Sequence, residues 1–170
     1  MTTAYLEVVA RGEPKGVVDL LISVDEEFDG NGVRSAIRQG YACDYAIVGE
    51  PTGLNIVRAH NGLLFLELTT TGLSAHGCCP ENGISAIERM LELVDDMREA
   101  IKQFGPHDLT GGPSLNLGEI HAGDRPNRVP DTCVSRIDIR FPPPARVADV
   151  EAAVLPPIDR REWASCKVEK

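Results

Sequence analysis

One stretch of the chain, residues 22–52, constrains the fold most strongly because it places acidic side chains directly after two apolar runs. Residues 17–24 are mostly apolar and β-branched, which predicts a buried strand, and Asp25, Glu26 and Glu27 follow it. A second apolar run, residues 45–48, leads to Glu50. Functional groups of open α/β sheets gather at the carboxyl ends of strands, so these carboxylates are expected at one sheet edge. With no Lys or Arg beside them, they favour a bound metal ion; the alternative is a solvated loop and a turn residue.

Charge and composition exclude several classes of partner. The chain has 170 residues, a net charge of −9 and 42% hydrophobic residues, so it can form a proper core but is a poor partner for nucleic acid or an anionic membrane. No apolar run approaches the length of a membrane span. The cysteines are odd in number and show no CxxC spacing, which favours reduced thiols in a cytoplasmic protein; they are Cys43, Cys78, Cys79, Cys133 and Cys166.

The first part of the chain is expected to alternate helices and strands. Residues 1–10 are typical of the last turns of a helix, and residues 33–39 have helical spacing that Gly40 closes as a C-terminal cap. Together with the two predicted strands, this order indicates a βαβ-type unit of a parallel sheet. Two strands are too few for an independent domain, so residues 1–53 are expected to be covered by a partner or to belong to something larger.

From residue 54 onward the pattern changes to that of a ferredoxin-like domain. Residues 54–59 and 63–71 predict two strands around the turn His60-Asn61-Gly62, because Asn-Gly is a strong hairpin signal. The next elements are a long amphipathic helix and then strand, strand, helix, strand, which is the split βαβ order. These elements are predicted at residues 83–103, 114–120, 132–141, 146–154 and 165–170.

The acidic cluster suits two roles in metal-assisted hydrolysis. A free carboxylate beside a metal can take a proton from metal-bound water, whose pKa the metal lowers towards roughly 7, while a second carboxylate ligates the ion. Glu26 and Glu27 are candidates for this pair, and Glu50 for a further ligand. Oxygen ligands alone favour magnesium or calcium, whereas a catalytic zinc requires imidazole. None of the four histidines lies in an HxH, HxD or HExxH pattern, so each is more simply a surface or turn residue.

Further candidates lie in loops and on one strand. His76 follows a run of small residues ahead of the long helix, and a histidine held in such a loop can donate a hydrogen bond to a developing oxyanion. The amide of Asn127, in another loop, can do similar work. Arg136 and Arg140 lie four apart on one predicted strand and therefore share a face, from which either can bind a carboxylate bidentately. The alternative for all four is ordinary loop geometry and a solvated strand face.

Taken in order, the motifs resemble the co-catalytic zinc amidohydrolase and exopeptidase family, which includes acetylornithine deacetylase, succinyl-diaminopimelate desuccinylase, aminoacylase and glutamate carboxypeptidase. The similarity covers nearly the whole chain, and the ordered set is more specific than any single motif. It is carried by Asp25-Glu26-Glu27, Ile47-Val48-Gly49-Glu50-Pro51-Thr52, Asn61-Gly62, Gly72-Leu73-Ser74-Ala75-His76-Gly77 with Pro80, Ile84-Ser85-Ala86-Ile87, Asn127-Arg128-Val129-Pro130 and Asp138-Ile139-Arg140-Phe141-Pro142.

The resemblance implies hydrolysis of an N-acyl amide or terminal peptide bond, with two zinc ions per active site (cobalt or manganese as alternatives). It implies that Glu26 is the general base, that Glu27 and Glu50 are metal ligands, and that His76 stabilises the oxyanion, in dimeric members across to the partner's site. It further implies that Asn127 and Arg140 contact the substrate, a small N-acyl amino acid or short peptide. Residues 1–53 would be part of the α/β catalytic domain, and residues 54–170 a ferredoxin-like α+β lid domain that forms a homodimer.

Departures from the family pattern indicate how much of the site this chain carries. The family's N-terminal His-x-Asp motif, its bridging aspartate and its C-terminal ligand histidine have no counterpart in the sequence. Two of five expected ligands are present, so the chain is expected to be an internal piece of a longer enzyme, inactive alone. The alternatives are a non-catalytic dimerisation or small-molecule-binding module and an unrelated calcium- or magnesium-binding α/β domain.

Overall fold

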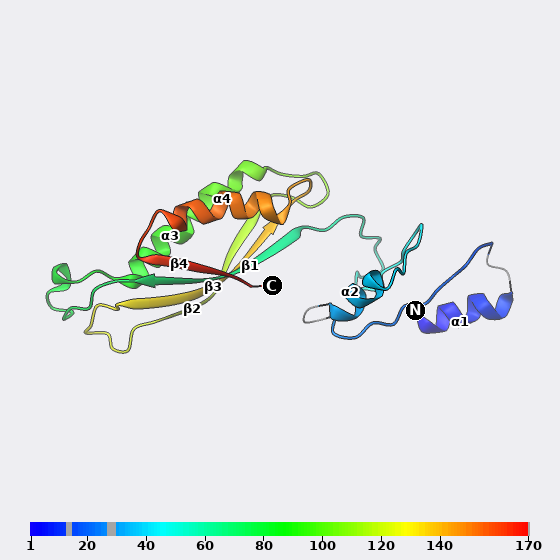
Figure 1. The fold of residues 1–170 in the computed structure, drawn as a ribbon, viewed down its shortest axis with the longest axis horizontal. Helices are drawn as coiled ribbons and strands as arrows, with labels where there is room; N and C mark the ends of the chain where they lie inside the picture. Colours follow the sequence, from blue (N-terminus) through cyan, green and yellow to red (C-terminus); the bar gives the residue numbers. More distant parts are fainter. Residues whose placement is uncertain (13–14, 27–29, 170) are drawn as a thin grey trace. The chain divides into compact units, whose positions relative to one another are not determined.

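The computed structural model describes residues 1–12, 15–26 and 30–169 (Figure 1). The chain divides into two compact units, Met1–Ile56 and Val57–Lys170. Across the described residues, no helix is both long enough and apolar enough to cross a membrane.

The second unit is a two-layer α/β sandwich in which helices α3 and α4 cover one face of a four-stranded sheet (Figure 1). The strand order is β2-β3-β1-β4, and every neighbouring pair is antiparallel. This is the split βαβ arrangement that the sequence pattern predicts for residues 54–170. The elements are β1 (Gly62–Thr71), α3 (Ala86–Ile101), β2 (Ser114–Ala122), β3 (Thr132–Phe141), α4 (Val147–Asp159) and β4 (Ala164–Glu169), with short 3-10 turns at Pro80–Asn82 and Lys102–Phe104.

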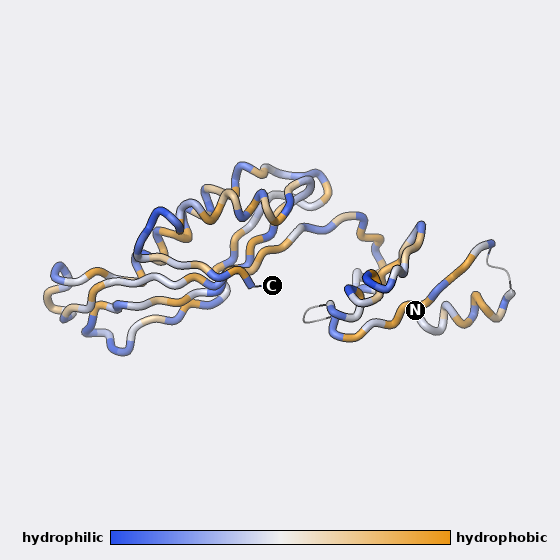
Figure 2. The backbone as a smooth tube through the Cα atoms, in the orientation of Figure 1, coloured by the Kyte–Doolittle hydropathy of each residue, from blue (hydrophilic) through white to orange (hydrophobic). Residues whose placement is uncertain are grey.

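Alternation along the central strands decides which side chains enter the core. In β3, Ser135, Ile137 and Ile139 are buried under the helices, while Arg136 and Arg140 lie on the uncovered face. Figure 2 shows this alternation as changing hydropathy along the strands. The core is completed by buried side chains from β1, α3 and α4: Leu64, Leu66, Leu68, Met90, Leu93, Val94, Met97, Val150, Val154 and Ile158.

Both helices begin where a side chain can cap them. The Ser85 hydroxyl accepts a hydrogen bond from the Glu88 backbone N–H at 3.3 Å, so α3 begins at Ala86 rather than at residue 83. At α4, the Arg146 backbone N–H donates to Asp149 Oδ2 at 2.9 Å. This helix continues to Asp159, beyond the predicted end at residue 154, because Ile158 one turn further is also buried in the core.

The predicted hairpin at His60-Asn61-Gly62 is wrong. Residues 54–59 form no strand, and β1 begins directly at Gly62. Neither Asn61 nor Gly62 has the positive φ that a tight Asn-Gly turn requires. The glycine has a different reason: a Cβ at position 62 would lie 2.3 Å from the Phe141 ring, so only glycine lets β1 pass that ring.

The first unit contains helices but not the predicted strands. Helices α1 (Thr2–Arg11) and α2 (Asn31–Arg38) occupy the two segments with helical spacing, and Gly40 after α2 has the left-handed φ of 87°. Residues 17–24 and 45–48 are not strands, so the predicted βαβ-type unit does not form. A strand is stable only when a neighbour pairs with its backbone. Within the described residues these runs have no such neighbour, and Tyr45 is 94% exposed.

Candidate functional site

Two loops of the second unit, residues 72–85 and 124–131, are joined through their backbones. His76 forms an isolated antiparallel bridge with Arg128, and the Gly77 N–H donates to the Asn127 carbonyl at 2.8 Å. The Val129 N–H donates to the Ala75 carbonyl at 2.9 Å. The fold therefore brings the backbones at His76 and Asn127, about fifty residues apart in the sequence, next to each other at one end of the sheet.

Glycines allow the close approach of these segments. A Cβ at Gly77 would lie 3.0 Å from the carbonyl carbon of Asn127, and one at Gly83 would lie 2.8 Å from the Ala75 Cβ. At Gly72 the contact is tightest, 2.0 Å from the Ile84 carbonyl oxygen. The small-residue pattern around His76 thus reflects backbone packing between loops.

Replacing Gly72 with alanine is expected to destabilise the second unit. The new methyl group would push against the Ile84 carbonyl, which accepts the Leu73 N–H at 2.8 Å, so that bridge must open or shift. Overpacking of this kind costs about 1–3 kcal/mol, measured by urea unfolding. Gly112→Ala is the control, since a Cβ there meets nothing within 4 Å and its φ is not positive. Equal stability of both variants would contradict the packing role.

The orientation of the His76 ring is set by a local hydrogen bond. The Cys78 backbone N–H donates to His76 Nδ1 at 3.2 Å. Because Nδ1 accepts this bond, the neutral imidazole carries its proton on Nε2. His76 is exposed, so Nε2 presents an N–H donor at the surface of the loop pair.

Arg128 is the residue of this site that sequence reasoning did not single out as functional. Its Nε donates to the Ser74 hydroxyl at 2.7 Å, and its terminal nitrogens lie 3.3 Å from carboxylate oxygens of Asp124 and Asp131. It therefore ties the two loops together beside His76. The only sequence signal for Arg128 was its place in the motif Asn127-Arg128-Val129-Pro130. Its partner Ser74 lies 54 residues away in the sequence, so the contact between them could not be predicted.

Arg140 lies far from the loop pair. Residue 140 is near the end of β3, whereas Asn127 and Arg128 precede its start, and a ten-residue strand spans roughly 30 Å. Arg140 Nε donates to Asp138 Oδ2 at 3.0 Å, and its guanidinium lies 5.8 Å from the centroid of the Phe65 ring. The structure does not bring Arg140 together with His76 and Asn127.

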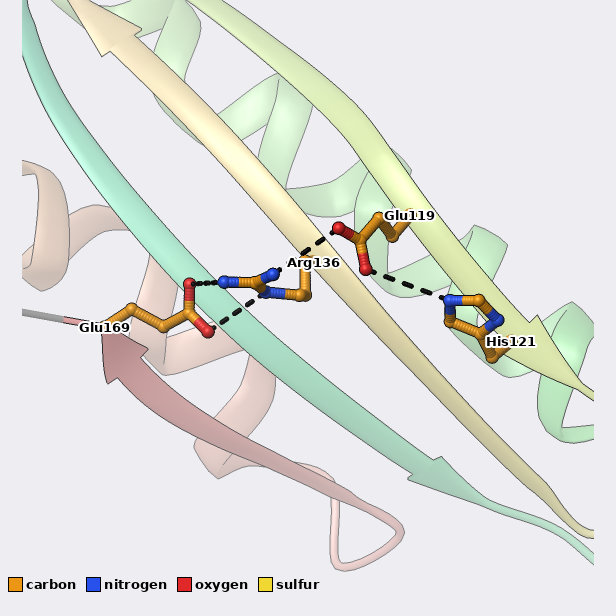
Figure 3. Close-up of polar contacts among 4 residues, drawn as sticks. All are labelled: Glu119, His121, Arg136 and Glu169. Carbon is orange, nitrogen blue, oxygen red and sulfur yellow. Dashed lines mark hydrogen bonds and ion pairs between the residues drawn. The ribbon is translucent and has the colours of Figure 1, made fainter. Parts of the chain in front are cut away.

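The other arginine on the uncovered face of the sheet, Arg136, forms ion pairs with carboxylates of the chain itself (Figure 3). It binds Glu169 of β4 bidentately at 3.0 and 2.7 Å and approaches Glu119 of β2 at 3.4 Å, with His121 a further 3.8 Å from Glu119. The hydrogen bond from Arg136 lowers the pKa of Glu169. Burial opposes this effect less strongly, and the charges of Arg136 and Lys167 add smaller contributions that lower the pKa further. This network links both edge strands across the sheet, so Arg136 is not free to bind a substrate carboxylate.

The contribution of Glu169 to stability is expected to depend on pH. Because its pKa in the folded chain lies below the ordinary value, its stabilising effect is present at neutral pH and is lost as pH falls through that lowered pKa. We expect Glu169→Gln to lower Tm at neutral pH, and the difference from the unsubstituted chain to vanish once the pH lies well below that lowered pKa. Glu162→Gln is the control because Glu162 is exposed and has no ion pair among the described residues. A pH-independent difference would argue against the ion pair.

Among the residues that the structure describes, the acidic side chains of the first unit do not form a complete zinc site. Glu26 and Glu50 are exposed, and Glu27 lies outside the described residues. The described residues contain no group of three or more His, Cys, Asp or Glu side chains able to hold a metal ion. A catalytic zinc takes three protein ligands and favours imidazole among them, so the described donor set does not fit this ion.

Comparisons with known proteins agree on one family. The family model of the peptidase dimerisation domain, the M20 dimerisation domain, matches residues 58–159. Acetylornithine deacetylase from Proteus mirabilis is 36% identical over 138 residues, which are 78% of this chain and 36% of that protein. The enzyme of the same name from Pasteurella multocida is 37% identical over 137 residues, 77% and 36% of the two chains. The chain therefore spans about a third of the length of the curated relatives it matches.

Solved structures show the same fold at low identity. An amidase of the hydantoinase/carbamoylase family from Burkholderia multivorans matches with a TM-score of 0.52 and 21% identity, over 65% of this chain and 27% of that chain. A further amidase of that family, from Burkholderia phymatum, matches with a TM-score of 0.53 and 16% identity, over 64% and 27%. At these identities the likeness concerns the fold alone. Together with the matches above, it confirms the resemblance inferred from the ordered motifs.

Proposed function

Because this chain belongs to the peptidase dimerisation domain family, we propose that it serves in a metal-dependent hydrolase that cleaves an N-acyl amide or terminal peptide bond. The observation that carries the proposal is the bond from the Cys78 N–H to His76 Nδ1, which leaves the Nε2–H of the exposed ring as its remaining donor, in a loop whose backbone is bonded to Asn127. Sequence similarity to acetylornithine deacetylases supports an N-acyl amino acid as the substrate class.

In this proposal the joined loops supply hydrogen-bond donors to the substrate carbonyl. Hydrolysis of an amide builds negative charge on that oxygen, and preorganised N–H donors stabilise it more than they stabilise the starting carbonyl. We propose His76 Nε2–H as one donor and the side-chain amide of Asn127, whose backbone carbonyl accepts the Gly77 N–H, as a second. Arg128 is a positioning residue that holds the two loops in register.

The remaining residues keep the roles that the resemblance implies, as proposals. Glu26 would act as the general base, Glu27 and Glu50 as ligands of a divalent metal, with zinc as the first candidate, and Arg140 as a substrate contact. Bound metal would supply Lewis acidity and an activated water. Since the described carboxylates do not make a zinc site, no step of the reaction is assigned to the metal.

The proposed activity is tested by offering substrates to the protein that carries this chain. We expect the protein to release acetate and ornithine from N-acetylornithine. The release of the new amino group is monitored with a ninhydrin-type assay. An unacylated dipeptide should be cleaved more slowly. Loss of activity in excess chelator and its return with divalent metal would support a metal-dependent hydrolase. Absence of hydrolysis of both substrates in the metal-loaded protein would overturn the proposal.

A second candidate function, homodimerisation without catalysis, is favoured by the family match to a dimerisation domain over residues 58–159. The sheet leaves β2 and β4 as edge strands, and α3 exposes Leu91 at 47%. Edge pairing and the outer face of α3 are the two surfaces on which we propose that copies meet. We expect dimers in sedimentation equilibrium over a range of concentrations; monomer alone at high concentration would count against dimerisation.

A further inference from the structure

The two arginines on the uncovered face of the sheet differ in what the chain itself leaves free. Arg136 is held from both sides, because Glu169 binds its Nε and one Nη atom and Glu119 approaches the other Nη atom (Figure 3). Arg140 is bound through Nε alone, which lies 2.8 and 3.0 Å from the two carboxylate oxygens of Asp138. Within the described residues, no acceptor of the chain bonds to either Nη atom of Arg140.

Asp138 sets the direction of the Arg140 side chain along the strand. Residues 138 and 140 both lie on the uncovered face of β3, and positions two apart on a strand are separated by about 7 Å. Arg140 therefore reaches back toward the middle of the strand to place Nε against the carboxylate of Asp138. Because Nε is used by this bond, the guanidinium presents its Nη pair, which can bind a carboxylate through two parallel hydrogen bonds.

Phe65 supports the same guanidinium from the neighbouring strand. In the register of β1 and β3, Phe65 lies directly opposite Asp138. An arginine that reaches back from position 140 to position 138 therefore approaches this ring, and the Arg140 Cζ atom lies 5.8 Å from its centroid. That distance is within the range of cation–π attraction. Both supports are on the two central strands of the sheet, which are paired on either side.

We propose that Asp138 and Phe65 are positioning residues that hold the Nη pair of Arg140 ready for a ligand carboxylate. A free arginine side chain loses much rotamer freedom when it binds, whereas one that is already fixed loses less. Leu63 and Phe65, which are 46% and 38% exposed, add an apolar surface beside the guanidinium. The guanidinium edge and this surface suit a small carboxylate with a partly apolar substituent. The inference rests on the proposed function, in which Arg140 contacts the substrate.

The charge of Asp138 acts against its positioning role, so the two effects are separable by their sign. A negative charge beside a carboxylate site repels the ligand, and removing that charge alone would strengthen binding. The site is partly exposed, with 41% of the Arg140 side chain accessible, and water and salt screen such repulsion. We therefore expect the lost orientation of Arg140 to outweigh the lost repulsion when Asp138 is removed.

The first test compares N-acetylornithine with its carboxamide as substrates of the protein that carries this chain. Asp138→Ala should raise KM for N-acetylornithine roughly tenfold with little change in kcat. Asp138→Asn keeps an acceptor for Nε and should raise KM less. Phe65→Leu should raise KM roughly 2- to 5-fold, and Phe65→Tyr, which keeps an aromatic ring, should not. No variant should change KM for the carboxamide, which offers Arg140 no carboxylate.

Glu67→Gln is the matched control for Asp138. Glu67 is a carboxylate on the same face of the sheet, but it lies opposite Arg136 in the register of β1 and β3. It should leave both KM values unchanged. A lower KM for N-acetylornithine in Asp138→Ala would mean that Asp138 acts only through its charge. An equal rise for the carboxylate and the carboxamide would mean general damage to the site, and either result would overturn the proposal.

A spectroscopic test on the 170-residue chain separates this inference from the proposed function. In nitrogen-15 NMR spectra, the Nε–H signal of Arg140 reports its bond to Asp138 and should move in Asp138→Ala, while that of Arg136 stays in place. An Arg140 signal that does not move would overturn the positioning role. Absence of hydrolysis of N-acetylornithine would instead overturn the proposed function, and the position of the Arg140 signal would still decide whether Asp138 orients the guanidinium.

Discussion

If the proposed hydrolysis of N-acyl amino acids is correct, His76→Ala is expected to lower its kcat by roughly 100- to 1,000-fold, the cost of removing one oxyanion donor. The reason is local: the Cys78 N–H occupies Nδ1, so Nε2–H is the only donor the neutral ring can offer to a substrate oxygen. KM should change little, because this bond strengthens as charge develops in the transition state. Steady-state kinetics with N-acetylornithine separate the two parameters.

Two variants distinguish this role from a structural one. His76→Gln keeps a side-chain N–H donor and should recover part of the lost kcat. His107→Ala removes a histidine that makes the same local hydrogen bond, to the Leu109 N–H, in a loop outside the joined pair. It should retain full activity. Near-normal kcat in His76→Ala, or an equal loss in His107→Ala, would contradict the oxyanion role.

The fold of the second unit could be predicted because its signals are local and repeated. Residues 132–141 alternate apolar and polar side chains along the whole of β3, and one face of α3 is apolar throughout. The Asn61-Gly62 pair led to the wrong prediction of a hairpin turn. Glycine can serve either a positive φ in a turn or a close approach of another group, and the sequence does not distinguish the two. Here Gly62 makes room for the Phe141 ring and has no positive φ.

The first unit shows the opposite case. An apolar run such as residues 45–48 indicates burial, but a strand also requires a hydrogen-bonding neighbour, which the run itself does not specify. In the described residues the run is exposed, with Ile47 at 88% and Val48 at 77%. The pattern therefore predicted that these residues lie buried in a paired strand, but in the structure they are exposed and form no strand.

The candidate site was only partly predictable. The small residues around His76 drew attention to its loop as a candidate site, but the contact of that loop with Asn127 depends on the fold of the intervening α3 and β2. Arg136 and Arg140 were correctly predicted to share one face of a strand. The sequence could not show, however, that the guanidinium of Arg136 binds the carboxylate of Glu169. Long-range pairing of this kind has no local signal, which is why Arg128 was also missed as a link to Ser74.

Leu66→Ala is expected to have the largest effect on stability. Leu66 is fully buried in β1, the strand that pairs with both β3 and β4, opposite Ile137 and Val168. Truncating it removes apolar contacts on the helix-covered face and leaves a cavity that a central strand cannot easily close. Such a change costs about 2–5 kcal/mol and should lower Tm by roughly 10 °C or more, measured by calorimetry.

Leu63→Ala in the same strand is the matched control, since Leu63 points to the uncovered face and is 46% exposed. It has the same change in side-chain volume and should cost less than about 1 kcal/mol. A similar loss in both variants would mean that the uncovered face is also buried in solution, for example between copies of the chain. A loss confined to Leu66→Ala would locate the folding energy between the sheet and its two helices, independently of any partner.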